Sequence, residues 1–572
     1  MAKFKSRTFL FSVLISLFLP FTVFAANPPA SQTAGGIAQQ EKMLEKGKKL
    51  EKEIKQKPKK GKGVVTKKGA VEEEGEKVLI KTIKVEGVSL IPEKNIKDIT
   101  SQYEGRKLSL KGMQKIADLI TDEYRKKGYV TSRAYIPPQT VQKGVLIIRV
   151  VEGNVGKLEI RGNRYFKTAL LKRKIRLKTD KPFDYSELQK DLTAINEAPD
   201  RTARLTLVPG KKPGTTDIIM DVEDNFPFHL GFEYDNYGSR YIEKDRISAV
   251  VEHNNLLGFD DKLYLKLQRS EYDLYRLITG RYVVPLNNTT NAGAYFSHSK
   301  TKLDGEFEAV DSRGKATIIG LFMNKGLIDT ENVDLRLNLG FDYKNVKNYL
   351  LGALDSEDRL RIFKTGFDLD LNDKFGRTVI SPELDVGVPH ILGGMDSKDN
   401  NASREGAGGK FLKETVTLFR LQPAPFSSYI LWKNQAQYST YNLTASEQFQ
   451  IGGPMSVRGY PVAEFSGDKG YYTSLEWSFP PYFFPKKLRV PFTQDTIYKA
   501  FHVVLFYDWA TVHLNKVLSG DKKRRTLKSA GFGFRLNLSN DFSARIEFGY
   551  PLGKDSSDGH NLQRWIEVVH TF

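Results

Sequence analysis

The sequence predicts two small domains of βααββ order followed by a large antiparallel transmembrane β-barrel. Three observations lead to this fold class: an N-terminal export signal, a repeated order of strands and helices, and a long C-terminal part in which apolar and polar residues alternate. The chain has 572 residues, which is more than one ordinary domain.

The composition excludes several classes of protein. The chain has no cysteine, which excludes a disulfide scaffold, a cysteine nucleophile and thiolate-held zinc or iron–sulfur sites. Charged residues make up 27% and aromatic residues 11%, so the chain is neither a disordered polyelectrolyte nor a helical membrane bundle. The formal net charge of +20 suggests nucleic acid or anionic lipid as a partner.

Residues 1–25 have the features of a secretory signal peptide. Three basic residues precede an apolar run at 9–24, and Ala25 completes a cleavage pattern. A transmembrane anchor is the alternative, but the run is short for one and contains Pro20. The sequence therefore predicts export to the periplasm, the medium or the outer membrane.

The composition of residues 26–77 predicts a helix followed by a linker. The segment 39–56 is built mostly from good helix formers and would be polar nearly all round, although Gly47 weakens this prediction. Simple disorder is the alternative for this segment. Residues 57–70 are rich in lysine and glycine and predict a flexible linker.

Residues 78–152 and 153–224 repeat one order of elements. In the first unit we expect strands at 78–85, 129–136 and 144–151 and helices at 92–100 and 108–127. In the second we expect strands at 155–160, 203–208 and 215–222 and helices at 170–175 and 185–195. The sequence therefore predicts two βααββ domains in tandem.

Residues 225–572 predict the barrel. The run 333–344 places every apolar residue on one face, and the runs 363–372, 530–538 and 542–550 do nearly the same. Alternating strands of about ten residues, rich in aromatic residues, are typical of a transmembrane β-barrel, and about sixteen are present. A soluble β-sandwich is the alternative, which the export signal disfavours.

The positive charge lies mostly before the barrel. The net charge is +5 over residues 27–77 and +10 over 78–224, but only +2 over 225–572. This distribution indicates a periplasmic binding segment, and the export signal and the lack of a nucleic-acid-binding motif disfavour nucleic acid as a partner.

Arg458 and Asp508 are the candidate ion pair. Arg458 is flanked by glycine and proline in the segment 452–460, and a loop that folds into a barrel lumen needs an anchor. A guanidinium can pair bidentately with a carboxylate, and Asp508 lies in an apolar strand where a buried, unpaired carboxylate would be costly. We expect a salt bridge in the lumen. A solvated arginine and an unrelated aspartate are the alternative, because strand parity does not settle the direction of Asp508.

The signal, the paired βααββ units, the barrel and three motifs together resemble the two-partner secretion transporters of the haemolysin/haemagglutinin secretion-activation type. These belong to the outer-membrane superfamily of periplasmic POTRA domains followed by a barrel, which has sixteen strands in this family. The motifs are 128–139 (GYVTSRAYIPPQ), 457–460 (VRGY) and 506–510 (FYDWA). Ala510 stands where the family has glycine, and 128–139 alone could be an ordinary strand that ends at two prolines.

The resemblance implies roles for individual residues. The loop-six motif would be Val457, Arg458, Gly459 and Tyr460, with Asp508 as its lumen partner. The POTRA motif would comprise Gly128, Tyr129, Arg133, Tyr135, Pro137 and Pro138, and Phe572 would be the C-terminal insertion signal. The helix at 39–56 is similar in place and composition to the family's plug helix.

The resemblance also implies a function and partners. POTRA domains in the periplasm would capture an unfolded secreted exoprotein by strand addition, and the barrel would export it through the outer membrane. The partners would be this client, outer-membrane lipid, and the barrel-assembly machinery during biogenesis. A barrel-assembly factor is the main alternative, and a passive porin would need no POTRA pair. No catalytic motif is present, so we expect no enzyme activity, cofactor or metal.

Overall fold

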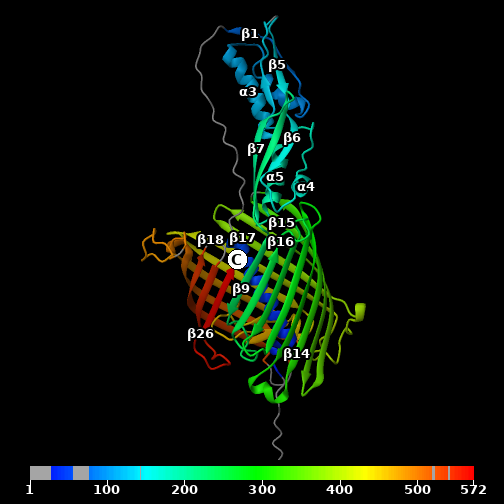
Figure 1. The fold of residues 1–572 in the computed structure, drawn as a ribbon, viewed down its shortest axis with the longest axis vertical. Coiled ribbons are helices and arrows are strands. Elements are labelled where there is room, and N and C mark those ends of the chain that lie inside the picture. Colours follow the sequence, from blue (N-terminus) through cyan, green and yellow to red (C-terminus); the bar gives the residue numbers. More distant parts are fainter. Residues whose placement is uncertain are drawn as a thin grey trace, which may run out of the picture.

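The computed structural model describes residues 28–55, 77–141, 143–330, 332–491, 493–517, 522–538 and 542–572. The predicted signal peptide and the linker at 57–70 lie outside these residues. Two small units form an arm that stands on one end of a barrel (Figure 1).

The first unit packs two helices against a three-stranded sheet of order β2-β5-β4. Its elements are β1 (Val78–Ile80), β2 (Thr82–Glu86), α2 (Glu93–Thr100), β3 (Arg106–Leu108), α3 (Leu110–Lys126), β4 (Arg133–Tyr135) and β5 (Val145–Val151). The apolar stripe of α3 is buried, with Ile116, Ile120 and Tyr124 at 0% exposure.

Two of the predicted strands of the first unit differ in the structure, and β3 was not predicted. The predicted strand at 78–85 is divided at Lys81, whose N–H donates to the Gly144 carbonyl at 2.7 Å. The part before Lys81 pairs with β3, and the part after it pairs with β5. The predicted strand at 129–136 is reduced to β4, because the Ser132 N–H donates to the Tyr129 carbonyl at 3.1 Å and makes a turn there.

The second unit has its own sheet, of order β6-β8-β7. Its elements are β6 (Asn154–Arg161), α4 (Thr168–Lys174), α5 (Tyr185–Asn196), β7 (Arg201–Pro209) and β8 (Thr215–Asp224). Asp184 caps α5, since its carboxylate accepts from the N–H groups of Ser186 at 2.8 Å and Glu187 at 3.2 Å.

Glu152, at the end of the first unit, joins three of that unit's segments. Its carboxylate accepts hydrogen bonds from the Ser89 hydroxyl, the Leu90 N–H at 2.8 Å and the Tyr124 hydroxyl at 2.6 Å. Burial alone would raise the pKa of Glu152, but the hydrogen bonds from Ser89, Tyr124 and Leu90 outweigh it and lower that pKa.

We expect Glu152→Gln to destabilise the first unit by about 1–3 kcal/mol, because a neutral amide replaces a charged acceptor. Since the folded pKa is lowered, the contribution of Glu152 is complete above pH about 5 and is lost as the pH falls below about 4. Hydrogen exchange of the full chain at residues 87–91 measures both effects. Glu86→Gln, at an exposed pair with Arg149, is the control, and equal exchange in the two variants would contradict this role.

The barrel is closed and has sixteen antiparallel strands, which confirms the predicted number. The strands are β9 (Phe228–Asp235), β10 (Arg246–His253), β11 (Lys262–Ser270), β12 (Tyr275–Pro285), β13 (Thr290–Lys302), β14 (Arg313–Asp329), β15 (Val333–Leu350), β16 (Ala353–Asp373), β17 (Gly376–Gly387), β18 (Phe411–Ala424), β19 (Ser428–Ser439), β22 (Lys469–Phe479), β23 (Phe501–His513), β24 (Arg524–Leu538), β25 (Phe542–Pro551) and β26 (Gln563–Thr571). The last strand pairs with the first, and the Phe572 N–H donates to the Leu230 carbonyl at 2.8 Å.

Alternate residues of a barrel strand face outward and into the lumen. In β22, Leu475 and Trp477 are 53% and 46% exposed, whereas Ser474 and Glu476 are buried. An apolar outer face and a polar inner face are what a lipid-embedded barrel requires.

Shorter elements are not part of the barrel wall. They are β20 (Phe449–Ile451), β21 (Phe465–Gly467), α6 (Ile497–Ala500) and the 3-10 helices η1 (Ala30–Gln32), η2 (Gly305–Val310), η3 (Ile391–Gly393) and η4 (Ala445–Glu447). None of the described helices is both long enough and apolar enough to cross a membrane.

Ion pairs join the second unit to the barrel. The guanidinium of Arg201 is fully buried and pairs bidentately with Asp260, in the β10–β11 turn, with Nη2–Oδ2 at 2.7 Å. Lys174 Nζ lies 2.7 Å from the same carboxylate. Between the same two segments, the Asn254 amide donates to Asp200 at 2.7 Å.

We expect Arg201→Ala to loosen this junction, because removing one partner of a buried pair costs about 3–5 kcal/mol. Spin labels on two introduced cysteines, one in α3 and one in β22, should give a broader distance distribution than in the parent chain. Arg204→Ala is the matched control, since Arg204 lies on the same strand and pairs with Glu223 at the exposed surface. Equal widths in the two variants would show that the ion pair does not set the junction.

Candidate functional site

The connection between β19 and β22 folds back into the barrel. Gly452 and Gly453 turn its chain with φ values of +104° and +95°, which L side chains rarely adopt. At Gly459 the backbone lies against the wall, where a Cβ would stand 2.7 Å from both Pro551 N and Ser529 Cβ. Only a glycine fits there, so the residue before it, Arg458, is brought against the barrel strands.

The structure brings Arg458 and Asp508 together in the lumen. Arg458 Nη2 lies 2.7 Å from Asp508 Oδ1, and its Nε lies 3.0 Å from Oδ2. The Arg458 N–H also donates to Oδ2, at 3.1 Å. The Arg458 and Asp508 side chains are 2% and 0% exposed, so Asp508 faces the lumen. The alternation of residues in its strand had not determined this direction.

Two further carboxylates surround the guanidinium and are absent from the sequence prediction. Arg458 Nη1 lies 2.9 Å from Glu476 Oε1 and 3.3 Å from Glu547 Oε2. Alternation in the 542–550 run did place Glu547 on the polar face, but its nearness to Arg458 depends on how the barrel closes. Arg458 therefore contacts three carboxylates, and two of them, Glu476 and Glu547, also pair with Arg535.

Packing also fixes the Arg458 segment. The guanidinium carbon lies 3.4 Å from the centroid of the Phe506 ring, and Trp565 Nε1 donates to the Arg458 carbonyl at 2.8 Å. Val457 and Tyr460 are buried in one apolar cluster, and the Tyr460 hydroxyl donates to the Lys554 carbonyl at 2.9 Å. All four residues of the predicted loop motif thus lie at the wall of the lumen.

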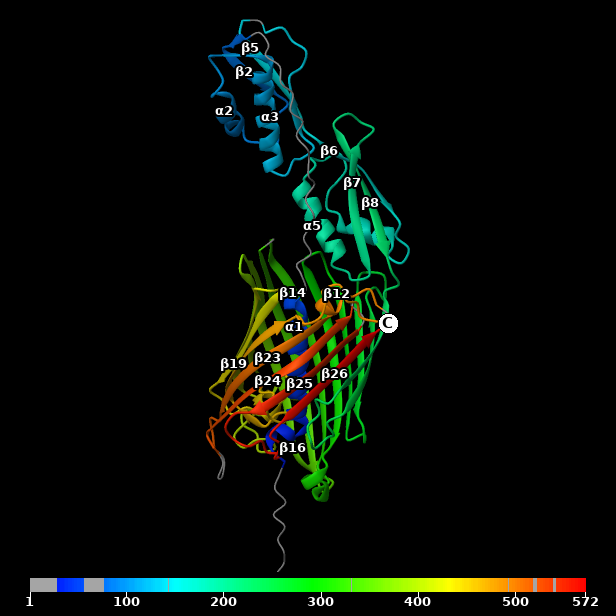
Figure 2. The ribbon, with the colours of Figure 1, turned by 90° about the vertical axis from the view of Figure 1, so that its left-hand side faces the viewer.

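Helix α1 (Ala34–Lys55) lies inside the barrel (Figure 2). It begins five residues before the predicted start at 39, and residue 56 of that prediction lies outside the described part. Gly47 packs against the folded-back loop, since a Cβ there would stand 2.4 Å from the Met455 methyl group and that side chain would have to shift. The described part of the segment is helical, as predicted, and not disordered.

Ion pairs hold α1 against the barrel wall. Glu41 pairs with Arg246, Glu45 with Lys266, and Lys48 with Glu567. Glu51 has three barrel partners, which are Lys433, Arg535 and Arg545. Glu51 lies 3.1 Å from both Lys433 and Arg545 and 3.4 Å from Arg535.

Glu476 connects the helix to the loop. It lies 2.8 Å from Lys433, 2.9 Å from Arg535 and 2.9 Å from Arg458. The first two of these cations also contact Glu51. Helix α1 and the folded-back loop therefore share one buried charge network.

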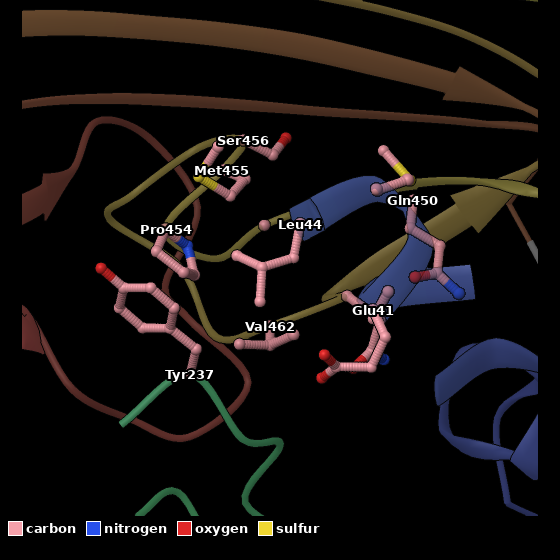
Figure 3. A pocket seen from close by; sticks show the side chains of 12 residues that line it. Glu41, Leu44, Tyr237, Gln450, Pro454, Met455, Ser456 and Val462 are labelled. Carbon is pink, nitrogen blue, oxygen red and sulfur yellow. The ribbon is translucent and has the colours of Figure 1, made fainter. Parts of the chain in front are cut away.

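A small cavity separates α1 from the loop (Figure 3). Leu44 of the helix faces Pro454, Met455 and Val462 of the loop, with Tyr237 on the barrel side. The cavity has about 40 Å³, room for little more than one or two waters. The helix and the loop are therefore in nearly continuous contact.

The predicted POTRA motif residues lie at two places. Gly128, with φ +94°, marks the joint with the second unit, since its carbonyl accepts from the Tyr185 N–H at 3.0 Å. Tyr129 packs edge-on against Tyr124. Arg133 and Tyr135 are exposed on β4, which among the described residues pairs only with β5, and Pro137 and Pro138 follow the strand.

Phe572 lies at the barrel seam. Its ring is 67% exposed and packs edge-on against the Phe232 ring of the first barrel strand, with ring centroids 6.2 Å apart.

Within the described part of the chain, no three acidic or histidine side chains are grouped to hold a metal ion.

Three family models match the chain in order. "POTRA domain, ShlB-type" matches residues 78–153, "Surface antigen variable number repeat", a POTRA model, matches 154–223, and "Haemolysin secretion/activation protein ShlB/FhaC/HecB" matches 214–496. The chain belongs to the haemolysin secretion/activation family. It is an outer-membrane transporter of the two-partner secretion type, with its POTRA region in the periplasm.

Relatives and solved structures agree with this assignment. The heme/hemopexin transporter protein HuxB of Haemophilus influenzae (strain 86-028NP) is 24% identical over 83% of each chain. The outer membrane transporter CdiB of Dickeya dadantii (strain 3937) is 23% identical over 70% of this chain and 72% of CdiB. The structure of CdiB from Escherichia coli shares the fold, with a TM-score of 0.73 at 20% identity over 96% of this chain and 100% of CdiB.

Proposed function

We propose that this transporter captures an unfolded, secreted exoprotein at its periplasmic units and exports it through the barrel. The observation that carries the proposal is the polar plug. Helix α1 occupies the lumen through ion pairs, whose charges can be rehydrated when the helix leaves. A client in transit needs the space that this helix fills.

We infer that the periplasmic units are two POTRA domains of βααββ order, at 78–152 and 153–224, with the barrel over 225–572. Strand addition at a sheet edge would capture the client. The edge strand β7 has nine residues, whereas β4 has three, so β7 gives the longer template. The net charge of +10 over 78–224 would attract an acidic client and would do so less strongly in salt.

The barrel would serve transport, and no residue would have a catalytic role. Arg458, Asp508 and the motif around them would hold the folded-back loop, and Phe572 would guide insertion by the barrel-assembly machinery. Outer-membrane lipid surrounds the barrel in this scheme, and nucleic acid has no part.

Deletion of the gene tests the function. If the protein exports an exoprotein, the medium and cell surface should lose one large protein while other barrel proteins stay at normal levels. If barrel proteins fall instead and no secreted protein is lost, the protein is an assembly factor and the proposal is wrong.

A further inference from the structure

The connection between β22 and β23 forms a folded protrusion at the periplasmic end of the barrel. Its described residues are 480–491 and 493–500, and it extends sideways as the orange segment in Figure 1. The other connections at this end, as the described strands bound them, have eight residues or fewer. The Ile497 N–H donates to the Leu488 carbonyl at 2.8 Å and the Val490 N–H to the Asp495 carbonyl at 2.9 Å, so the protrusion closes on itself.

The tip of the protrusion exposes aromatic and basic side chains together. Every residue from 482 to 489 is exposed, and Phe483 reaches 77%. The apolar members are Tyr482, Phe483, Phe484 and Leu488, and the basic members are Lys486, Lys487 and Arg489. The stretch contains no acidic residue. Such a surface would be unfavourable in water alone and is complementary to an anionic, partly apolar partner.

This surface continues the lipid-facing wall of the barrel. Trp477, on the outer face of β22, packs against Phe479 with ring centroids 4.9 Å apart, and Phe479 stacks on Tyr482 at 5.9 Å. The Tyr482 hydroxyl donates at 3.1 Å to the carbonyl of Phe426, whose own ring is 82% exposed in the β18–β19 turn. A row of aromatic rings therefore runs from the membrane wall into the protrusion.

We propose that residues 480–491 form an interfacial anchor in the periplasmic leaflet of the outer membrane. Phe483 and Phe484 insert among the acyl chains near the headgroups, where aromatic side chains of membrane proteins concentrate. Lys486, Lys487 and Arg489 bind the phosphates of anionic phospholipids. The anchor fixes the height and tilt of the barrel while the periplasmic arm engages other molecules.

Fluorescent labelling tests the insertion, because the chain has no cysteine and one introduced cysteine is unique. Phe483→Cys and Leu110→Cys are labelled with an environment-sensitive dye in the full chain. The full chains are then placed in vesicles of phosphatidylethanolamine and phosphatidylglycerol. Leu110 is the matched control, an apolar residue of α3 with 69% exposure. We expect headgroup-level nitroxide lipids to quench the dye at 483 and aqueous iodide to quench the dye at 110.

Charge variants test the lipid class. We expect phosphatidylglycerol carrying the nitroxide to quench the 483 dye more than phosphatidylcholine carrying it. The triple variant K486Q/K487Q/R489Q should lower this preference at least about fivefold, since each cation near an anionic leaflet contributes about that factor. The heat-dependent gel mobility of the barrel verifies that each variant is folded.

Two results would overturn the proposal. Equal quenching of both dyes by iodide would show that the tip stays in water and is a surface for a protein. Quenching at 483 without any preference for phosphatidylglycerol, in the parent and triple variant alike, would show an apolar contact and no headgroup site.

Discussion

Arg458→Ala is expected to abolish export and to destabilise the folded-back loop by about 3–5 kcal/mol, because a buried charge network loses its central cation. Glu476 and Glu547 would keep Arg535 as a counter-ion, whereas Asp508 would keep the hydrogen bonds from the Ser474 and Ser529 hydroxyls but lose Arg458. We expect the loop to leave the wall and become accessible. Loss of the exoprotein from the medium and new protease cleavage within 440–468 measure the two effects.

Exchange of the two charges sharpens this prediction. In a simple ion pair, R458D/D508R would restore what each single reversal destroys. Here the exchanged aspartate would stand beside Glu476 and Glu547, so we expect the double variant to remain defective. Arg269→Ala, at an exposed arginine of β11, is the control and should export normally. Full rescue by the double variant would show that only Asp508 matters to Arg458.

The sequence was sufficient to predict the pair but not its surroundings. Arg458 and Asp508 could be matched because each would be costly alone in a buried place. Glu476 and Glu547 lie on β22 and β25, which do not pair with each other. Their distance from Arg458 depends on the curvature of the barrel wall and on the path of the loop. The alternation of residues within one strand predicts neither of these.

The first residue of α1 could also not be predicted from the sequence, because local helix propensity does not include contacts in the lumen. The predicted segment began at residue 39, where the run of good helix formers starts, whereas α1 begins at Ala34 and includes Gly35 and Gly36. In the lumen, a Cβ at position 35 would stand 3.1 Å from Ser446 Cβ, so close packing favours the smaller residue. The bounds of the other long helices were recoverable from periodicity to within one or two residues, since each helix buries one apolar face.

Deletion of residues 30–55 is expected to open the barrel, with the conductance of single channels in planar bilayers rising severalfold and channels staying open. The ion pairs of α1 with Arg246, Lys266, Lys433 and Arg545 disappear with it. Glu51→Ala should have a smaller effect of the same sign. Removing one partner of a buried charge cluster costs about 2 kcal/mol or more, and this corresponds to a roughly thirtyfold shift toward the displaced helix.

Glu53→Ala is the control for Glu51→Ala, because it distinguishes loss of the buried ion pairs from a change in helix propensity. Glu53 lies two residues from Glu51 on the same helix, but its side chain is 46% exposed and pairs only loosely with Lys49, at 3.6 Å. Alanine raises intrinsic helix propensity slightly in both variants, so a difference between them reflects the contacts of Glu51. If Glu51→Ala and Glu53→Ala give the same open probability, the shared network does not hold the plug. If Glu51→Ala alone opens the channel, the same buried charges that fix the loop also set how readily the helix leaves.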